Sequence, residues 1–549
     1  MQKDKSLKKE SFMQAVFSLI FSQILIKILG LVYTLYLTNK EGFGDAGNAI
    51  YGSAYQIYAM LLTLSSIGVP NAISKLVAER TALGDHKGAH RIFKVAFATF
   101  AVIGLIGTLI LFFGADFIAT TALEIPEAKY TLLALSPAVF FVSIASVLRG
   151  YFNGRESMKV TARSQSLEQI FKTIFTILIV ELVFALSSGN TVWMAAGANI
   201  ATTLSIFLSF MYLFTLYKMH SKEIGKEIQT SINYKYQKVK TIVKRILLVS
   251  IPMSLSSIMS SFNKNIDSFT VVRNLKKFMP EAEAKAQYGI LGVKVDTLTS
   301  LPLAINIAFA TALVPAISAA RAKKDENTVT KRVSFSLLAS MLIGLPCTVG
   351  MIVFADPILK LLYPNASEGA VILQISALTI IFTILDQTIN GTLQGIGKVM
   401  VPAISLGCGM LTKLVFNLVL VPNPVFGVNG AAIGSVACHM VAFSIAFTVL
   451  RKNVKLDLTV SKFLIKPLMA TAIMGVCSYF VYSKLLCGII AEKWATILSI
   501  LFAIIIYVLA ILALKILNKE DIYMIPYGKK IYKILQKLGI YEKEANEEV

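Results

Sequence analysis

The chain has 549 residues, of which 56% are hydrophobic and only 15% are charged, and its formal net charge is +22. A soluble surface needs a larger charged fraction, so this composition excludes a soluble protein of several domains and indicates an all-α polytopic membrane protein. Four histidines and five cysteines without a CxxC spacing form no metal-binding pattern, and no Walker or GxGxxG motif is present, so we do not expect an enzyme.

Windows of roughly 20 apolar residues predict about fourteen transmembrane helices. An even number of spans places both termini on the same side of the membrane. In chain order, the predicted spans are 12–38, 50–72, 93–114, 131–152, 164–186, 192–217, 246–270, 288–318, 334–355, 370–393, 400–421, 429–450, 464–484 and 494–516.

Basic residues are distributed unequally between the two sides of these spans. They concentrate in the N-terminal tail, in the loops after even-numbered spans and in the C-terminal tail. The other side carries Lys40, Lys129, Arg273, Lys276, Lys277, Lys285, Lys360, Lys484 and Lys493. This asymmetry follows the positive-inside rule and predicts two cytoplasmic termini. The positive net charge therefore indicates topology and contact with anionic membrane lipids, and not nucleic-acid binding.

An internal repeat predicts two related halves. Segments 148–172 and 389–413 align without a gap, and each contains the end of one span, a glycine-containing turn and the start of the next. The matching positions include Gly150 with Gly391, Gly154 with Gly395 and Lys172 with Lys413. A second echo, GVPNAISK at 68–75 and LVPAISAA at 313–320, occurs in the same order. A shift of six helices preserves orientation, so we predict two pseudo-symmetric six-helix lobes related as parallel repeats.

The longest polar connection sets the predicted domain boundaries. The expected parts are an N-lobe of helices 1–6 (1–217), a basic cytoplasmic linker (218–245), a C-lobe of helices 7–12 (246–452), two further helices (453–517) and a cytoplasmic tail (518–549).

The tail contains an amphipathic pattern. In KKIYKILQKLGI, the residues Ile531, Ile534, Leu535 and Leu538 form one apolar stripe between lysines. This pattern predicts a helix that lies at the membrane interface, with a solvated tail as the alternative.

Away from the ends of the predicted spans, five basic residues lie inside them, and all are lysines: Lys27, Lys172, Lys264, Lys294 and Lys413. A lysine at the centre of a membrane helix costs roughly 2.5 to 3.5 kcal/mol and usually faces the bundle interior or a water-filled path. Prolines interrupt several spans, as in transporter helices that bend around a cavity. We therefore predict that these lysines bind an anionic headgroup such as a phosphate or pyrophosphate. Snorkelling or pairing across helices is the alternative for each of them.

Acidic residues inside the spans allow a different interpretation. Lys264 and Asp267 are three residues apart, and Lys294 lies two residues before Asp296, so each pair is expected to be partly neutralised. Asp386 with Asn390, one turn later, is a candidate site for Na⁺ or a proton together with Asp267. A carboxylate cluster is also what an exporter of organic cations would use. With no nucleotide-binding motif, the expected driving force is an ion gradient, the membrane potential or downstream consumption of the product.

The pattern of lobes and motifs resembles the MOP superfamily of exporters (multidrug, oligosaccharidyl-lipid and polysaccharide). The residues that carry the resemblance are KILG at 27–30, LPLAINIAFATALVPAIS at 301–318 and the repeated glycine turns. Over nearly its full length the chain is similar to the Gram-positive (YtgP and SpoVB-like) branch of the lipid II flippase family, MurJ. The resemblance implies a MATE-like central cavity that opens alternately to each side and holds the pyrophosphate of a lipid-linked disaccharide-pentapeptide with cationic side chains. It also places the polyprenyl tail near the last two spans.

The family's cavity residues transfer only in part. Lys27 falls on the first basic position of span one in Gram-negative members. Their second basic position aligns with Tyr33, their span-two basic residues align with leucines near Leu61, and their span-eight basic residue aligns with Thr297, one turn from Lys294. The resemblance thus implies direct equivalence only for Lys27, with Lys294 as a substitute.

These observations predict an alternating-access flippase that moves lipid II, the undecaprenyl-pyrophosphate-linked peptidoglycan precursor, to the outer leaflet of a bacterial plasma membrane. Its expected partners are this glycolipid, anionic lipids and proteins of cell-wall synthesis. The alternatives are a flippase for another polyprenyl-linked polysaccharide unit, a cation-coupled antiporter of the MATE type, and a scaffold of a wall-synthesis complex without transport activity.

Overall fold

The computed structural model describes residues 12–537 with several gaps. The gaps are residues 67, 156, 233–237, 305, 307–312, 314–316, 318–320, 322–324, 399 and 525–527. Three predictions lie largely outside the described residues: the basic N-terminal segment, the echo at 313–320 with the second half of the 301–318 motif, and the end of the amphipathic tail.

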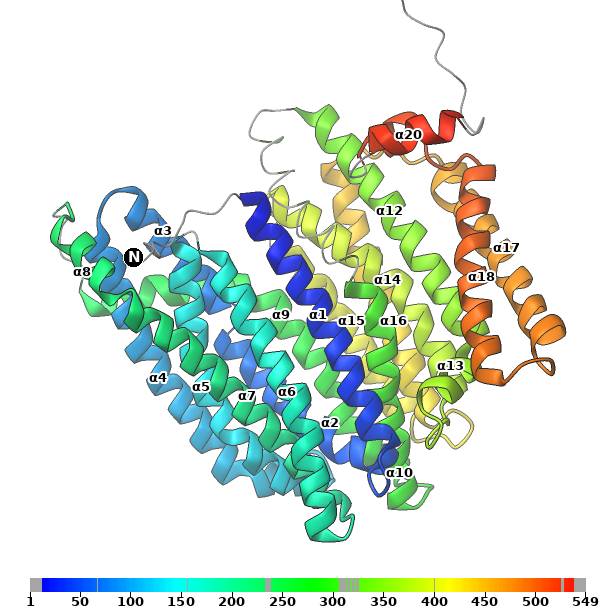
Figure 1. Ribbon diagram of the computed structural model, residues 1–549, viewed down its shortest axis with the longest axis horizontal. Helices are drawn as coiled ribbons and strands as arrows, with labels where there is room; N and C mark the ends of the chain where they lie inside the picture. The colour runs from blue at the N-terminus through cyan, green and yellow to red at the C-terminus, as the bar shows by residue number, and fades with distance from the viewer. Residues whose placement is uncertain are drawn as a thin grey trace, which may run out of the picture. The chain divides into compact units, whose positions relative to one another are not determined.

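The described residues are helical and contain no β-strand, which confirms the all-α prediction (Figure 1). The α-helices are α1 (Phe12–Asn39), α2 (Gly44–Ser66), α3 (Gly68–Ala82), α4 (His86–Phe117), α5 (Ala128–Gly154), α6 (Met158–Ser187), α7 (Thr191–Met219), α8 (Ser221–Gln229), α9 (Val239–Leu275), α10 (Glu281–Gly289), α12 (Glu326–Val353), α13 (Ala355–Leu362), α14 (Ala370–Gly395), α15 (Val401–Val419), α16 (Val428–Asn453), α17 (Lys466–Phe480), α18 (Glu492–Ala513), α19 (Lys519–Met524) and α20 (Gly528–Lys537). The π-helical turns are η1 (Ile118–Ala122), η2 (Ile290–Val295), η3 (Ser461–Ile465) and η4 (Val481–Leu486).

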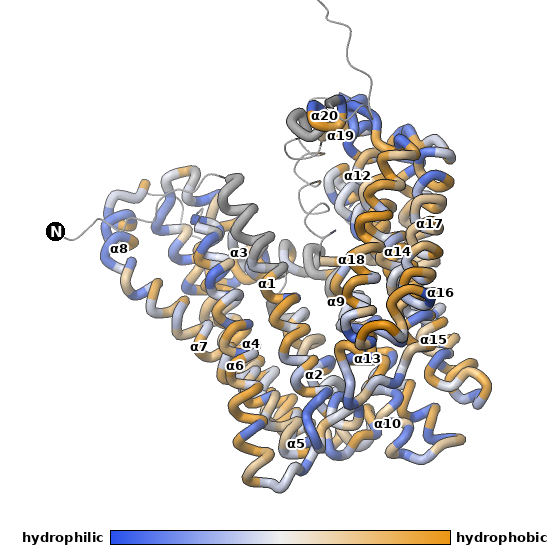
Figure 2. Tube along the Cα trace, turned by 45° about the vertical axis from the view of Figure 1, so that its right-hand side comes forward, coloured by the Kyte–Doolittle hydropathy of each residue, from blue (hydrophilic) through white to orange (hydrophobic). Residues whose placement is uncertain are grey.

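Every predicted span overlaps at least one helix. The second span is divided between α2 and α3, and the eighth consists of α10, η2 and the helical residues 296–304 before the first gap in that region. Within the described part, ten helices are long and apolar enough to cross a membrane. Figure 2 shows apolar residues along the long helices and polar residues on α8 and α10. The chain is a polytopic membrane protein.

Polar caps define where several long helices begin. The side-chain oxygen Oδ1 of Asp85 accepts a hydrogen bond from the backbone N–H of Gly88 at the start of α4. Asn190 caps α7 in the same way, and Asp325 caps α12. Each cap satisfies a backbone donor that the first helical turn leaves open. The helix starts therefore follow from polar residues placed just before apolar runs.

The chain forms two compact units. One consists of Met1–Ala304 and Val399–Ala442, and the other of Ile305–Lys398 and Phe443–Val549. Helices α9 and α10 pack against α2 within the first unit, although the sequence assigns them to a second lobe. The compact units thus differ from the predicted parts, and the division into six-helix lobes stays a prediction.

Helix α5 lies at the centre of the packing in the first unit. It contacts α2, α3, α4 and α7, and most of its residues are buried. Gly150 and Gly154, from the predicted repeat, face α3. A Cβ atom on Gly150 would lie 2.8 Å from the carbonyl oxygen of Pro70, and one on Gly154 would lie 2.8 Å from that of Ser74. The glycine pair thus lets the two backbones approach closely, as small residues do in membrane bundles.

The C-terminal tail forms short helices in the second unit. Tyr532 and Leu535 of α20 are buried and pack with Ile522 of α19, whereas Ile534 is exposed. The predicted helix is therefore present up to Lys537, whereas its position at the membrane interface stays a prediction, and Leu538 of the predicted stripe lies outside the described residues.

The turn η2 introduces an irregularity beside the functional residues. The backbone N–H of Asp296 donates to the carbonyl of Leu291, five residues earlier. A π-helical turn of this kind accommodates one additional residue in an otherwise α-helical segment. Lys294 lies inside the turn and Asp296 follows it directly.

The close approach of α5 to α3 predicts a specific sensitivity. We expect Gly150→Ala to destabilise the protein by roughly 1–3 kcal/mol, because the added methyl group would overlap the backbone of Pro70. Thermal unfolding of the purified protein in detergent measures this loss. Gly407→Ala in α15 is the matched control, because a Cβ atom there has no neighbour within 4 Å. An equal fall in unfolding temperature for both variants would contradict the proposed close packing.

Candidate functional site

A cavity of about 340 Å³ lies within the first unit. Its wall is formed by α1, α2, α6, α9, η2 and the helical residues after η2. The polar residues that line it are Lys27, Tyr33, Thr34, Tyr51, Tyr55, Gln56, Gln169, Lys172, Ser260, Ser261, Lys264, Asp296, Thr297 and Ser300. Three of the five predicted lysines therefore share one cavity.

Lys27 projects into this cavity from α1. Its side chain is partly buried, and its ammonium nitrogen lies 3.5 Å from the hydroxyl oxygen of Ser300. This contact is a weak hydrogen bond at the limit of the usual distance. The ammonium group consequently keeps most of its capacity to donate to a ligand.

Lys172 enters the cavity from α6 and is held by aromatic side chains. Lys172 is only 4% exposed. The ammonium nitrogen lies 4.7 Å from the ring centroid of Tyr33 and 4.2 Å from that of Tyr55, and it donates to the hydroxyl of Tyr33 at 3.3 Å. Cation–π contacts stabilise a buried cation without cancelling its charge. The two tyrosines therefore hold the Lys172 ammonium group in place and leave its charge available to an anion.

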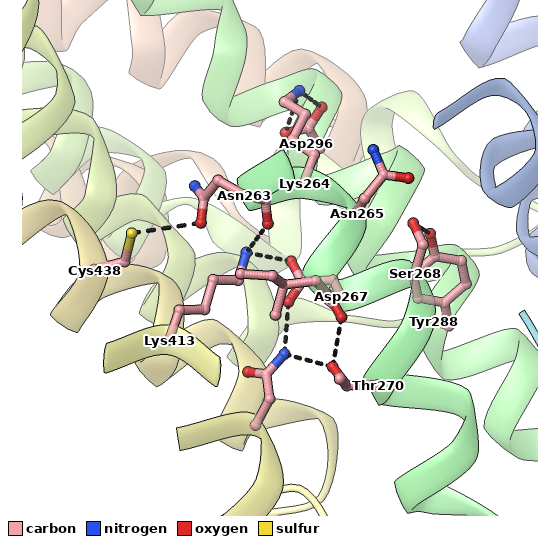
Figure 3. A network of polar contacts seen from close by, with 12 residues as sticks. Asn263, Lys264, Asn265, Asp267, Ser268, Thr270, Tyr288, Asp296, Lys413 and Cys438 are labelled. Carbon is pink, nitrogen blue, oxygen red and sulfur yellow. Dashed lines mark hydrogen bonds and ion pairs between the residues drawn. The ribbon is translucent and has the colours of Figure 1, made fainter. Parts of the chain in front are cut away.

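Lys264 is paired with a carboxylate in the same cavity (Figure 3). Its ammonium nitrogen lies 2.7 Å from Oδ2 and 3.1 Å from Oδ1 of Asp296. The sequence predicts other partners, namely Asp267 for Lys264 and Asp296 for Lys294. The direct ion-pair partners are instead Asp296 for Lys264 and Asp45 for Lys294, and each belongs to a different element from its lysine.

The remaining two lysines lie in separate ion pairs and do not line the cavity. Lys294 is fully buried, and its ammonium nitrogen lies 3.0 Å from Oδ2 of Asp45 on α2. Lys413 is 3% exposed and lies 2.6 Å from Oδ2 of Asp267. Each pair joins two elements of the first unit. The substrate-binding role predicted for these two lysines therefore has no support in their contacts.

The charges of the cavity do not cancel. Its charged lining groups are Lys27, Lys172, Lys264 and Asp296, so the described lining carries a net charge of +2 when all are ionised. Lys264 and Asp296 neutralise each other, whereas Lys27 and Lys172 contact hydroxyls and rings. The arrangement suits a divalent anion.

Most of the neutral polar lining was missed by sequence reasoning. Tyr51 and Tyr55 are one turn apart on α2, with Gln56 beside them, and all line the cavity. Their signal was present as polar and aromatic side chains at helical spacing in an apolar span. Charge alone, which guided the prediction, does not reveal this face.

The other predicted coupling residues lie in the second unit. On α14, the amide nitrogen of Asn390 donates to Oδ2 of Asp386 at 2.8 Å. Asp386 is 8% exposed, and in the part of the chain that the structure describes, Oδ1 of Asp386 and Oδ1 of Asn390 lack a hydrogen-bond partner. Asp267, predicted to act with them, belongs to the first unit and contacts Lys413.

Comparison with known proteins gives the following relationships. The family described as polysaccharide biosynthesis protein matches residues 12–321, and the MatE family matches residues 293–419. Stage V sporulation protein B of Bacillus subtilis (strain 168) is 28% identical over 95% of this chain and 98% of its own length. Lipid II flippase MurJ of the same organism is 23% identical over 84% of this chain and 87% of its own length.

Two solved structures share the fold. A lipid II flippase MurJ in an inward closed conformation has a TM-score of 0.65 and 16% identity, over 91% of this chain and 98% of that chain. An inward-facing multidrug resistance MATE family transporter of the MOP superfamily has a TM-score of 0.63 and 18% identity, over 80% of this chain and 97% of that chain. At these identities the likeness shows the fold alone.

The contacts of Lys294 predict a structural role. We expect Lys294→Met to lower the stability of the folded protein by roughly 3–5 kcal/mol, because the carboxylate of Asp45, only 12% exposed, would lose the ammonium group with which it pairs. The double variant Lys294→Met with Asp45→Asn is expected to regain part of this loss, as measured by thermal unfolding in detergent.

An exposed ion pair supplies the control for this experiment. Lys331 and Glu520 are 2.9 Å apart, but their side chains are 58% and 68% exposed. Lys331→Met is therefore expected to change stability little, because solvent screens exposed pairs. A loss as large as that of Lys294→Met would show that burial does not decide the effect.

Proposed function

Because this chain belongs to the family of polysaccharide biosynthesis proteins, we propose that it is an alternating-access flippase that moves lipid II to the outer leaflet. Lipid II is the cargo named for one relative and for one protein of the same fold. We place the protein in a bacterial plasma membrane with both termini in the cytoplasm, where peptidoglycan precursors are made and cell-wall synthesis proteins act.

The observation that carries the proposal is the net charge of the cavity. Lys27, Lys172, Lys264 and Asp296 together supply +2, and a pyrophosphate diester carries two negative charges. In a site of low dielectric, such complementarity is worth much more than in water. An organic cation would instead meet two ammonium groups without compensating carboxylates.

Each lysine has a distinct part in this mechanism. Lys172 is fixed on the rings of Tyr33 and Tyr55, so it holds one phosphate in a defined position. Lys27 has only a weak contact with Ser300 and adjusts to the second phosphate. The hydroxyl and amide groups around them donate and accept hydrogen bonds with the attached sugar, as polar groups do in other ligand sites.

The direction of movement is consistent with a simple driving force. An inside-negative membrane potential favours outward movement of an anion by roughly 2.3 kcal/mol per charge for each 100 mV. We assign any additional coupling to Na⁺ or a proton to Asp386 and Asn390, because two buried oxygens of this pair are open to a cation among the described contacts.

Two alternative functions are each supported by a specific observation. The match to the polysaccharide biosynthesis family favours another polyprenyl-linked polysaccharide unit as cargo, since the same cavity charges would hold its pyrophosphate. The MatE match and the buried Asp386 favour a cation-coupled antiporter, for which Asp386 would matter more than Lys27.

Substitutions at Lys27 test the proposal. In cells depleted of their native flippase, we expect Lys27→Ala to reduce lipid II accessibility at the outer leaflet about tenfold or more, because a hydrogen bond to a charged group contributes about 1.5–3 kcal/mol. Lys27→Glu should abolish it, since the cavity would then be neutral, and Lys27→Arg should retain most of it.

Membrane insertion must be equal in all variants, and Lys40→Ala serves as the control. Lys40 follows α1 and pairs with Glu181 outside the cavity, so its loss is expected to leave transport normal. Full lipid II accessibility with Lys27→Glu would refute the cavity as the pyrophosphate site. A defect restricted to Asp386→Asn would favour the antiporter.

A further inference from the structure

A second polar centre in the first unit surrounds the ammonium group of Lys413 (Figure 3). Lys413 lies on α15 and reaches α9, where its nitrogen is 2.6 Å from Oδ2 of Asp267 and 3.2 Å from the backbone carbonyl oxygen of Asn263. These residues do not line the cavity described above. The centre is therefore separate from the proposed cargo site.

Two further polar residues surround the Asp267 carboxylate of this centre. Asn417, one turn after Lys413, donates its amide nitrogen to Oδ1 of Asp267 and to the hydroxyl of Thr270, each at 2.9 Å. Asn417 is fully buried, and its Oδ1 has no hydrogen-bond partner among the described residues. Gly434 lies beside it, and a Cβ atom there would lie 3.0 Å from this oxygen. The absence of a side chain at Gly434 thus leaves room for an oxygen that accepts no hydrogen bond within the described part of the chain.

The set of oxygens has the chemistry of an alkali-cation site. Carboxylate, amide, hydroxyl and backbone carbonyl oxygens are the ligands that hard cations bind in proteins. An ammonium group is a compact point charge of the same sign that takes the same partners. Asp267, which the sequence makes a candidate for Na⁺ coupling, is therefore already occupied by a cation that belongs to the chain.

We propose that Lys413 is a tethered cation that fills an alkali-cation site formed by Asp267, Asn263, Thr270 and Asn417. In the natural protein this site takes no Na⁺, so Asp267 does not couple the protein to a sodium gradient. Removing the ammonium opens the site, and the Lys413→Ala variant binds Na⁺ there. The inference does not depend on which cargo the cavity carries.

Sodium-dependent stability tests the inference. The full-length protein is purified in detergent, and its unfolding temperature is measured in NaCl, KCl and choline chloride at constant ionic strength. For the natural protein we expect the same temperature in NaCl and choline chloride. In choline chloride, Lys413→Ala should unfold at a lower temperature than the natural protein. Its unfolding temperature should rise by several degrees with increasing NaCl concentration and then level off, because a ligand that binds only the folded state stabilises it. The gain should be lost in Lys413→Ala with Asp267→Asn.

Controls make each outcome decisive. Lys331→Ala, which leaves the exposed Glu520 unpaired, should show no sodium response. Lys413→Ser, which is smaller and adds one oxygen, serves as the second variant if Lys413→Ala does not fold, and it should also gain a sodium response. A folded Lys413→Ala or Lys413→Ser that ignores Na⁺ would overturn the proposal. So would a sodium response of the natural protein that Asp267→Asn removes, since a mobile ion would then bind beside Lys413.

Discussion

An ammonium group that leaves water must keep a compensating partner, and this requirement governs the interior of the first unit. Lys294 and Lys413 satisfy it with the carboxylates of Asp45 and Asp267 on other elements. Their pairs join η2 to α2 and α15 to α9. Breaking such a pair is far more costly than never forming it, because the remaining charge is stranded. The fold is thus tied together by charges that hydropathy alone would exclude.

The lysines of the cavity satisfy the same requirement differently. Lys172 rests on tyrosine rings and Lys27 on a hydroxyl, so neither loses its formal charge to a carboxylate. A lysine paired with a carboxylate contributes to architecture, whereas a lysine held by neutral groups retains a field that attracts an anion. This difference separates the cations that join two elements through ion pairs from those that keep an uncompensated charge in the cavity, and our proposed function rests on the second kind.

The sequence was sufficient to locate the helices and to identify the five lysines within apolar spans, because apolar length and isolated charges are local properties. It was not sufficient for their partners. Asp296 lies 32 residues after Lys264, and Asp267 lies 146 residues before Lys413, so only packing brings them together. Lys264 and Asp267 lie on one side of α9, yet Lys264 pairs with Asp296 and Asp267 pairs with Lys413, because residues from other elements offer a closer ion-pair contact. The tyrosine wall was missed for a related reason, since aromatic residues are ordinary in apolar spans.

The π-helical turn η2 affects the direction of the side chains that follow it. Its additional residue changes the angular register of the helical residues after Val295, where Asp296 pairs with Lys264, while Lys294 within the turn pairs with Asp45. A deletion of one residue there would turn the described helical residues 296–304 by about 100°. The length of this turn thus determines which of these side chains, Asp296, Thr297 and Ser300 among them, face the cavity.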